Sequence, residues 1–141
     1  MKIKVIMAVL FTAVLAVACK TSKQDVTMDV LSGHWNIISV NGENVPSDME
    51  NKPFMEFDVK EQRIHGNSGC NIMNGGFFQK KGQPNSLLLS RMASTMMACP
   101  NMEIEGKVLE ALRNVVSFSK ISNDKLALCD KDGKQIVVLQ K

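Results

Sequence analysis

The chain has 141 residues, 45% of them hydrophobic and 22% charged, with a formal net charge of +3 at pH 7. Without Lys2 and Lys4 near the N-terminus, the 17 basic residues fall to 15 against 14 acidic ones. This near-neutral balance excludes the basic surface that nucleic-acid binding requires. The length suits one domain with one core.

Residues 1–18 have the layout of a signal peptide. Lys2 and Lys4 form a positive start, and residues 5–18 form an apolar run in which Thr12 is the polar interruption. This run is shorter than the roughly 20 residues that a membrane-spanning helix needs, and it suits the transient apolar region of an exported precursor. We therefore expect export of the chain and removal of residues 1–18.

The apolar run ends in Leu15-Ala16-Val17-Ala18-Cys19, which resembles a lipobox, where signal peptidase II cuts before a lipidated cysteine. Ala16 stands where leucine is more usual, and the same stretch also fits the A-x-A site of ordinary secretion. The resemblance predicts a lipid on Cys19, and two or three acyl chains would anchor the protein firmly. Lys20 replaces the aspartate that retains some lipoproteins at the inner membrane, so we expect an outer-membrane lipoprotein, facing either leaflet.

Residues 19–28 are expected to form a lipidated flexible tether, because the stretch after Cys19 is mostly polar. Residues 29–141 remain as the folded domain. Its short apolar stretches, separated by Gly, Asn and Asp, predict strands and turns. We expect strands at residues 35–40, 54–59, 63–65, 76–80, 87–89, 92–99, 126–129 and 135–139, the last two joined by a hairpin turn.

Residues 102–116 carry the pattern of an amphipathic helix. Pro100 and Asn101 precede it, and both residue types are favoured at a helix start. The apolar residues recur at spacings of three and four, and they are Met102, Val108, Leu109, Leu112, Val115 and Val116. The expected fold is mainly β (α+β), with an antiparallel sheet wrapped around or against this single helix.

Glu105 interrupts the apolar stripe of the helix and should face the sheet. An unpartnered buried carboxylate would cost several kcal/mol. We therefore expect it to accept hydrogen bonds from backbone amides or a hydroxyl, near the positive end of its own helix. The functional alternative is a general acid or base with a raised pKa.

Two stretches stand out as motifs. They are Gly66-Asn67-Ser68-Gly69-Cys70-Asn71, with Gly75-Gly76 just after it, and Thr95-Met96-Met97-Ala98-Cys99-Pro100. With Leu-Ser-Gly-His-Trp at residues 31–35 and Glu105 downstream, they resemble the META domain, also called the HslJ-like family, over residues 31–139. The departure is an extra methionine in the second motif.

The resemblance implies a small antiparallel β-barrel-like sheet with one packed helix, often carried by lipoproteins. It implies no reaction, and family members are linked to heat shock, antibiotic tolerance and envelope maintenance. The motif positions to which we assign structural roles are Trp35, Gly66, Gly69, Asn71, Thr95 and Glu105.

Cys70 and Cys99 belong to these motifs, and disulfides persist in exported domains. Pairing them would close a loop of about 30 residues and stabilise the fold by roughly 3 to 4 kcal/mol. It would also join the Gly-Cys-Asn turn to the helix entry. Cys129 falls in a predicted strand as a buried thiol, although the sequence leaves its pairing with either of the others open.

Other chemistries find little support. A zinc site drawn from His65, Cys70, Cys99 and Cys129 lacks the close paired spacing of structural zinc ligands. A cysteine hydrolase needs a histidine base beside its thiolate, and His34 and His65 come with no oxyanion-hole motif. We predict no metal, no cofactor, no small-molecule substrate and no enzymatic activity.

Four methionines, Met92, Met96, Met97 and Met102, fall close together in the sequence. Exported thioethers can bind copper(I). Methionine also fills irregular cores, and this chain has one tryptophan and no tyrosine to do so. We favour core filling.

Two non-catalytic roles follow. The first is an envelope or stress-related lipoprotein that binds another envelope protein. The second is an outer-membrane-tethered inhibitor of a secreted peptidase, an analogy at the level of fold and anchor. Residues 41–52 and 80–86 are polar enough to present a binding surface.

Overall fold

The computed structural model describes residues 27–141. The expected signal peptide, Cys19 and most of the expected tether lie outside the described residues. The elements in chain order are η1 (Met28–Leu31), β1 (Gly33–Val40), β2 (Glu43–Asn44), β3 (Phe54–Asp58), β4 (Arg63–Asn67), β5 (Ile72–Phe78), β6 (Leu88–Leu89), β7 (Ala93–Ser94), α1 (Glu103–Arg113), β8 (Ser117–Lys120), β9 (Lys125–Cys129) and β10 (Gln135–Gln140).

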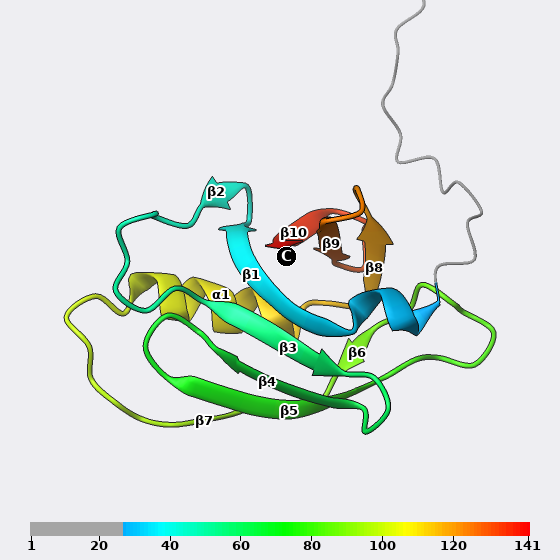
Figure 1. Ribbon diagram of the computed structural model, residues 1–141, viewed down its shortest axis with the longest axis horizontal. Helices are drawn as coiled ribbons and strands as arrows, with labels where there is room; N and C mark the ends of the chain where they lie inside the picture. Colours follow the sequence, from blue (N-terminus) through cyan, green and yellow to red (C-terminus); the bar gives the residue numbers. More distant parts are fainter. Residues whose placement is uncertain (1–26) are drawn as a thin grey trace, which may run out of the picture.

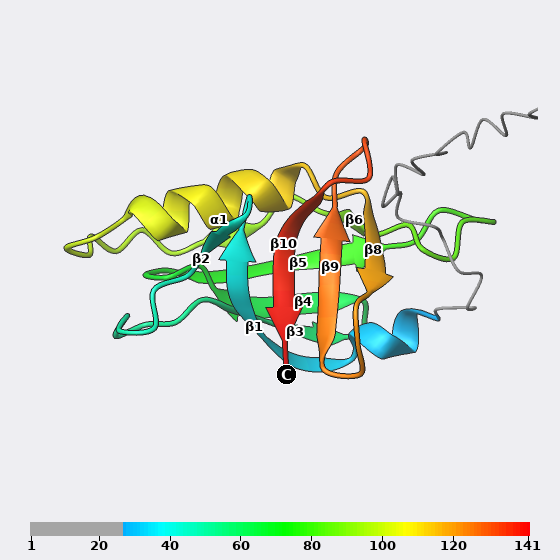
Figure 2. The same cartoon turned by 90° about the horizontal axis from the view of Figure 1, so that it is seen from above.

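The strands form one antiparallel sheet in the order β6-β5-β4-β3-β1-β10-β9-β8, with β2 on β1 and β7 on β5. Strand β1 belongs to both halves of this sheet. Residues 33–36 pair with β3, and residues 36–40 pair with β10 across a register shift between Ile37 and Ser39. Such irregularities bend a strand and increase its twist. As a result β1, β10 and β9 run across the direction of β3, β4 and β5 (Figure 2).

The sheet rolls up without closing into a barrel. The end strands β6 and β8 share no ladder. A short seam links β8 to the residues just before β6, and it consists of an isolated Ser86–Ser117 bridge and hydrogen bonds from Leu87 N–H to Val116 O and from Phe118 N–H to Asn85 O. The expected mainly β, α+β class is confirmed. The barrel-like expectation is corrected to an open rolled sheet, because this seam is too short to make a full strand pair.

Helix α1 lies along one open side of the roll, against β1 and β10 (Figures 1 and 2). It buries Val108, Ala111 and Leu112 in the core. In the part of the chain that the structure describes, the buried core lies within residues 31–139, so residues 27–141 contain a complete core of their own. Within this range no helix has the length and apolarity to cross a membrane.

The helix is shorter than the predicted 102–116. Met102 is its N-cap position, and Asn114 ends it by donating its backbone N–H to the carbonyls of Ala111 and Leu112. The chain leaves the helical path because Val116 donates its N–H to Cys129 O and leads into β8. The apolar spacing predicted a helix that continues to residue 116, but pairing with β9 ends the helix earlier.

The strand predictions differ from the structure mainly in β5, β7 and β8. Strand β5 begins at Ile72, ahead of the predicted residue 76, because its glycines pair with β4. Of the predicted strand at 92–99, Ala93–Ser94 alone pairs. Strand β8 was missed because Ser117–Lys120 carries one apolar residue, Phe118, on its buried face.

Candidate functional site

Glu105 lies in the first turn of α1, and its side chain is almost fully buried, with 4% of the residue exposed. One carboxylate oxygen accepts hydrogen bonds from Ser68 Oγ at 2.5 Å and from the Asn71 backbone N at 2.9 Å. The other accepts from Asn71 Nδ2 at 2.9 Å. A carboxylate is also favoured near a helix N-terminus. The donors are those that the sequence led us to expect, a backbone amide and a hydroxyl, with an amide side chain added.

These hydrogen bonds set the protonation state of Glu105. Burial alone raises the pKa of this carboxyl, but the hydrogen bonds from Ser68 and Asn71 outweigh burial and hold the pKa below its ordinary value. Glu105 is therefore ionised at neutral pH. A general acid would need a raised pKa, and the pKa of Glu105 is lowered instead. Its carboxylate serves to hold the turn before β5 against the helix.

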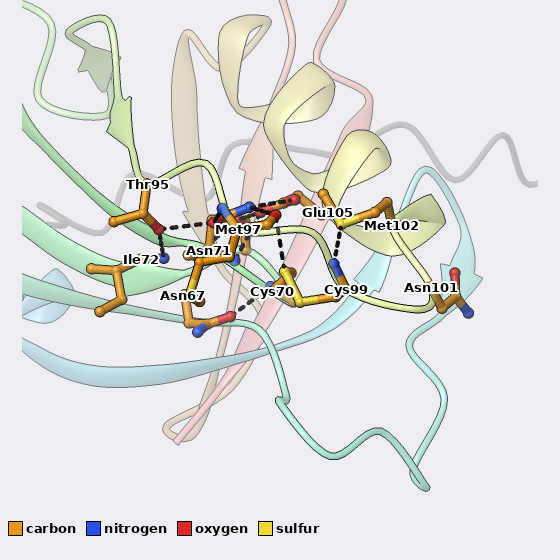
Figure 3. The surroundings of a disulfide bond; sticks show 12 residues. Asn67, Cys70, Asn71, Ile72, Thr95, Met97, Cys99, Asn101, Met102 and Glu105 are labelled. Atoms are coloured by element: carbon orange, nitrogen blue, oxygen red, sulfur yellow. Dashed lines mark hydrogen bonds between the residues drawn. A yellow bond between two sulfur atoms is a disulfide. The ribbon is translucent and has the colours of Figure 1, made fainter.

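Asn71 extends this network to the segment before the helix. Its Oδ1 accepts hydrogen bonds from Thr95 Oγ1 at 2.9 Å and Met97 N at 2.6 Å, and its Nδ2 also donates to Met97 O at 3.2 Å. Thr95 Oγ1 in turn accepts from Ile72 N at 3.0 Å. Figure 3 shows Asn71 between Thr95 and Glu105. Both the acceptor and the donor capacity of this amide are fully used.

Cys70 and Cys99 form a disulfide with Cα atoms 6.1 Å apart and a sequence separation of 29 residues. It lies beside the Asn71 network and joins the turn after β4 to the approach to α1 (Figure 3). This is the pairing expected from the motifs. Cys129 lies buried in β9, with its Sγ 3.9 Å from Ser119 Oγ.

Two motif glycines are required by geometry. A Cβ at Gly66 would collide with the backbone carbonyl of Phe54 and lie 2.9 Å from Met73 Cε. Gly69 has φ of +119°, which side chains rarely adopt. Its N–H donates to Asn67 Oδ1 at 2.7 Å, closing an Asx turn.

Trp35 lies apart from this cluster and is buried in the core, on strand β1. Its Nε1 donates to Leu31 O at 2.7 Å and so ties η1 to the sheet. Lys141 Nζ lies 4.9 Å from the centre of the Trp35 ring, within cation–π range. The structure therefore gathers Gly66, Gly69, Asn71, Thr95 and Glu105 around the disulfide and places Trp35 elsewhere.

Ser68 is the residue of this cluster that we missed. It lies inside the first motif, where we expected turn glycines to matter most, and it is fully buried. Its hydroxyl makes the shortest hydrogen bond to Glu105. A small hydroxyl residue among turn glycines, together with a buried carboxylate elsewhere, was the signal that could have indicated the pair.

The core-filling prediction is wrong for three of the four clustered methionines. Met96, Met97 and Met102 are 98%, 54% and 41% exposed. Met92 alone of the four packs against the core. The disulfide and the Asn71 contacts hold the backbone of this segment outside the sheet, so its side chains face solvent.

Both histidines lie on the outer face of the sheet, away from the disulfide. Register places His34 and His65 on either side of Glu56, and His65 Nδ1 lies 2.8 Å from Asn74 Oδ1. Cys70 and Cys99 are joined in the disulfide, so neither offers a thiolate to a histidine. Among the described residues, no three His, Cys, Asp or Glu side chains come together as a metal site.

The surface has two hollows of interest. One of about 1070 Å³ lies on the outer face of β3, β4 and β5, and its charges are of both signs. A smaller one of about 520 Å³ lies between residues 89–94 and the C-terminal half of α1. These hollows and the exposed loops offer the surfaces on which a ligand or partner could bind.

The fold and the buried cluster define a small α+β domain, an open rolled sheet packed on one helix and braced by a disulfide and a buried Glu–Asn network. The chain belongs to the META domain family, whose sequence model matches residues 27–141. No curated protein matches the sequence.

Two solved structures share the fold. The NMR structure of a protein from Burkholderia xenovorans has a TM-score of 0.63 and 22% identity, over 83% of this chain and 87% of that one. The crystal structure of a DUF4847 family protein from Bacteroides vulgatus ATCC 8482 has a TM-score of 0.56 and 17% identity, over 79% of this chain and 93% of that one. At these identities the likeness shows the fold alone.

Proposed function

We propose that the chain is an outer-membrane lipoprotein, anchored through Cys19, whose META domain binds another envelope protein and has no catalytic activity. The proposal that the domain is not catalytic is supported by one observation: the polar and thiol groups of the motifs are already engaged in contacts that hold the fold. Glu105 and Asn71 are buried and fully hydrogen-bonded, and Cys70 and Cys99 are joined to each other. We therefore expect the domain to act through binding at its surface.

The anchor rests on the N-terminal sequence and on the disulfide. A Cys70–Cys99 bond suits the oxidising compartments outside the cytoplasm. This agrees with the signal-peptide pattern of residues 1–18 and the lipobox-like stretch that ends at Cys19.

The anchor is tested by changing Cys19→Ala in cells fed with radiolabelled palmitate. The wild type should incorporate the label and sediment with outer membranes. The variant keeps the Ala16-Val17-Ala18 site, so it should be exported, unlabelled and found in the soluble fraction. Cys129→Ala is the matched control and should keep the label. A Cys19→Ala protein that still sediments with membranes would disprove the anchor.

The binding role is tested by crosslinking in intact cells, with the lipidated protein as bait. An envelope protein should be captured by the wild type in stoichiometric amount. The Cys19→Ala form, which lacks the anchor, should capture less of the same protein at equal expression. Equal recovery of unrelated abundant envelope proteins by both forms would contradict a specific partner.

A tethered peptidase inhibitor is the second candidate, and one observation favours it. The segment that carries Met96 protrudes into solvent while the disulfide and Asn71 fix its backbone. A pre-organised loop binds at lower entropic cost. Residues 27–141 should then inhibit a co-secreted peptidase at a one-to-one ratio. Met96→Asp should abolish the inhibition, and Gln83→Ala, in the 80–86 loop, should leave it unchanged. No inhibition at this ratio rules the role out.

A further inference from the structure

The hollow between residues 89–94 and α1 has the size of a small-ligand site. Its volume of about 520 Å³ lies within the roughly 300–1,000 Å³ of such sites. It is separate from the disulfide cluster, and neither the motifs nor the family assigns it a role. Its lining combines an apolar floor with two cationic side chains.

The floor comes from two directions. Leu109 and Leu112 lie three residues apart on α1, and Leu89 and Met92 face them from the opposite segment. All four belong to the core or pack against it. Gly75 leaves room for Met92, because a Cβ there would lie 2.5 Å from the Met92 Sδ. The floor is therefore an apolar surface continuous with the core.

The charges at the rim are of one sign. Arg91 and Arg113 are exposed and line this hollow, and no Asp or Glu lines it. Within residues 27–141 neither arginine forms an ion pair, since both ion pairs there belong to Lys107. Arg113 also lines a neighbouring hollow that includes Glu110 and Asp130, and it makes no ion pair with either carboxylate. Two guanidinium groups are thus available to an anion.

We infer that this hollow binds a single-chain anionic amphiphile, a fatty acid. Its acyl chain would lie along the four apolar side chains, and its carboxylate would meet Arg91 and Arg113, whose planar groups suit carboxylates. The hollow, at about 520 Å³, has the size to take one acyl chain. The inference goes beyond the proposed function and does not depend on the anchor.

The test uses residues 27–141 and the fluorescent fatty acid cis-parinaric acid. Its fluorescence should rise on titration and saturate at one molecule per protein. Dodecanoate should displace it, whereas dodecanol and dodecyltrimethylammonium should do so far more weakly. Arg91→Gln and Arg113→Gln should each weaken dodecanoate binding about tenfold. The control Arg63→Gln lies outside this hollow and should bind like the wild type.

Three results would overturn the inference. Dodecanol could compete as well as dodecanoate, or the Arg91→Gln, Arg113→Gln double variant could bind with unchanged affinity. Sedimentation with phosphatidylglycerol vesicles provides the third. If both arginines were needed for vesicle binding while cis-parinaric acid did not bind, they would contact a membrane surface and the fatty-acid site would be wrong.

Discussion

Asn71 donates two hydrogen bonds of 2.9 Å to Glu105, one from its backbone N and one from its side-chain Nδ2. One residue of the β4–β5 turn thereby donates to both carboxylate oxygens of a residue in the first turn of α1. The same side chain accepts hydrogen bonds from Thr95 and Met97. Asn71 thus joins the β4–β5 turn to the first turn of α1 and to the segment that precedes the helix.

Replacing the carboxylate should break this junction. Glu105→Gln presents an NH₂ group to donors and loses charge-assisted hydrogen bonds, so the free energy of unfolding should fall by about 2 to 3 kcal/mol. Urea unfolding of residues 27–141 measures it. The exposed helical residue Glu110, changed to Gln, is the control and should stay within about 0.5 kcal/mol of the wild type. Equal effects of the two changes would contradict the role of Glu105.

The same carboxylate should make stability depend on pH. Its folded pKa lies below the ordinary value of 4.5, so the folded state binds fewer protons than the unfolded state. The stabilisation is therefore complete above about pH 5 and is lost as the pH falls through the folded pKa. Urea unfolding between pH 3 and 7 should show the gap between the wild type and Glu105→Gln narrowing below pH 4.5. A gap that widens at low pH would reverse the assigned sign.

Removing the disulfide should destabilise the domain mainly through the unfolded state. The Cys70→Ala, Cys99→Ala double variant should lose about 3 to 4 kcal/mol, as expected for a loop of this length. Urea unfolding with and without dithiothreitol measures the loss. The reductant should lower the stability of the wild type and leave the double variant unchanged. A double variant as stable as the oxidised wild type would contradict the contribution of the Cys70–Cys99 disulfide.

Two glycine substitutions should have opposite signs. Gly66→Ala places a methyl group against the Phe54 carbonyl and should cost about 2 kcal/mol or more. Gly106→Ala, in α1 where no atom lies near the new Cβ, should stabilise the domain by about 0.5 to 1 kcal/mol. Thermal unfolding compares the two. A neutral Gly66→Ala would contradict the close backbone approach at this position.

The sequence predicted the features that depend on neighbouring residues, such as which side chains of a strand are buried and where the helix lies. The strand expected at residues 54–59 is β3, in which the alternating Met55 and Phe57 are buried and Glu56 and Asp58 are exposed. The helical stripe located α1, and the cost of a buried charge predicted hydrogen bonds to Glu105. These inferences need no knowledge of the rest of the chain.

Contacts between distant segments account for the differences. The helix ends early because Val116 pairs with β9, and β8 exists because Phe118 and its neighbours find partners there. Met96 and Met97 are exposed because Asn71, some 25 residues away, holds their backbone outside the sheet. No local spacing contains this information.

The place of β10 has a consequence for how such a chain is made. The last strand, Gln135–Gln140, lies between β1 and β9, so the middle of the sheet joins the two ends of the domain. Until the final residues are present, β1 and β9 lack the strand that lies between them. The two parts of the sheet can therefore be joined only after the C-terminal end of the chain has been made.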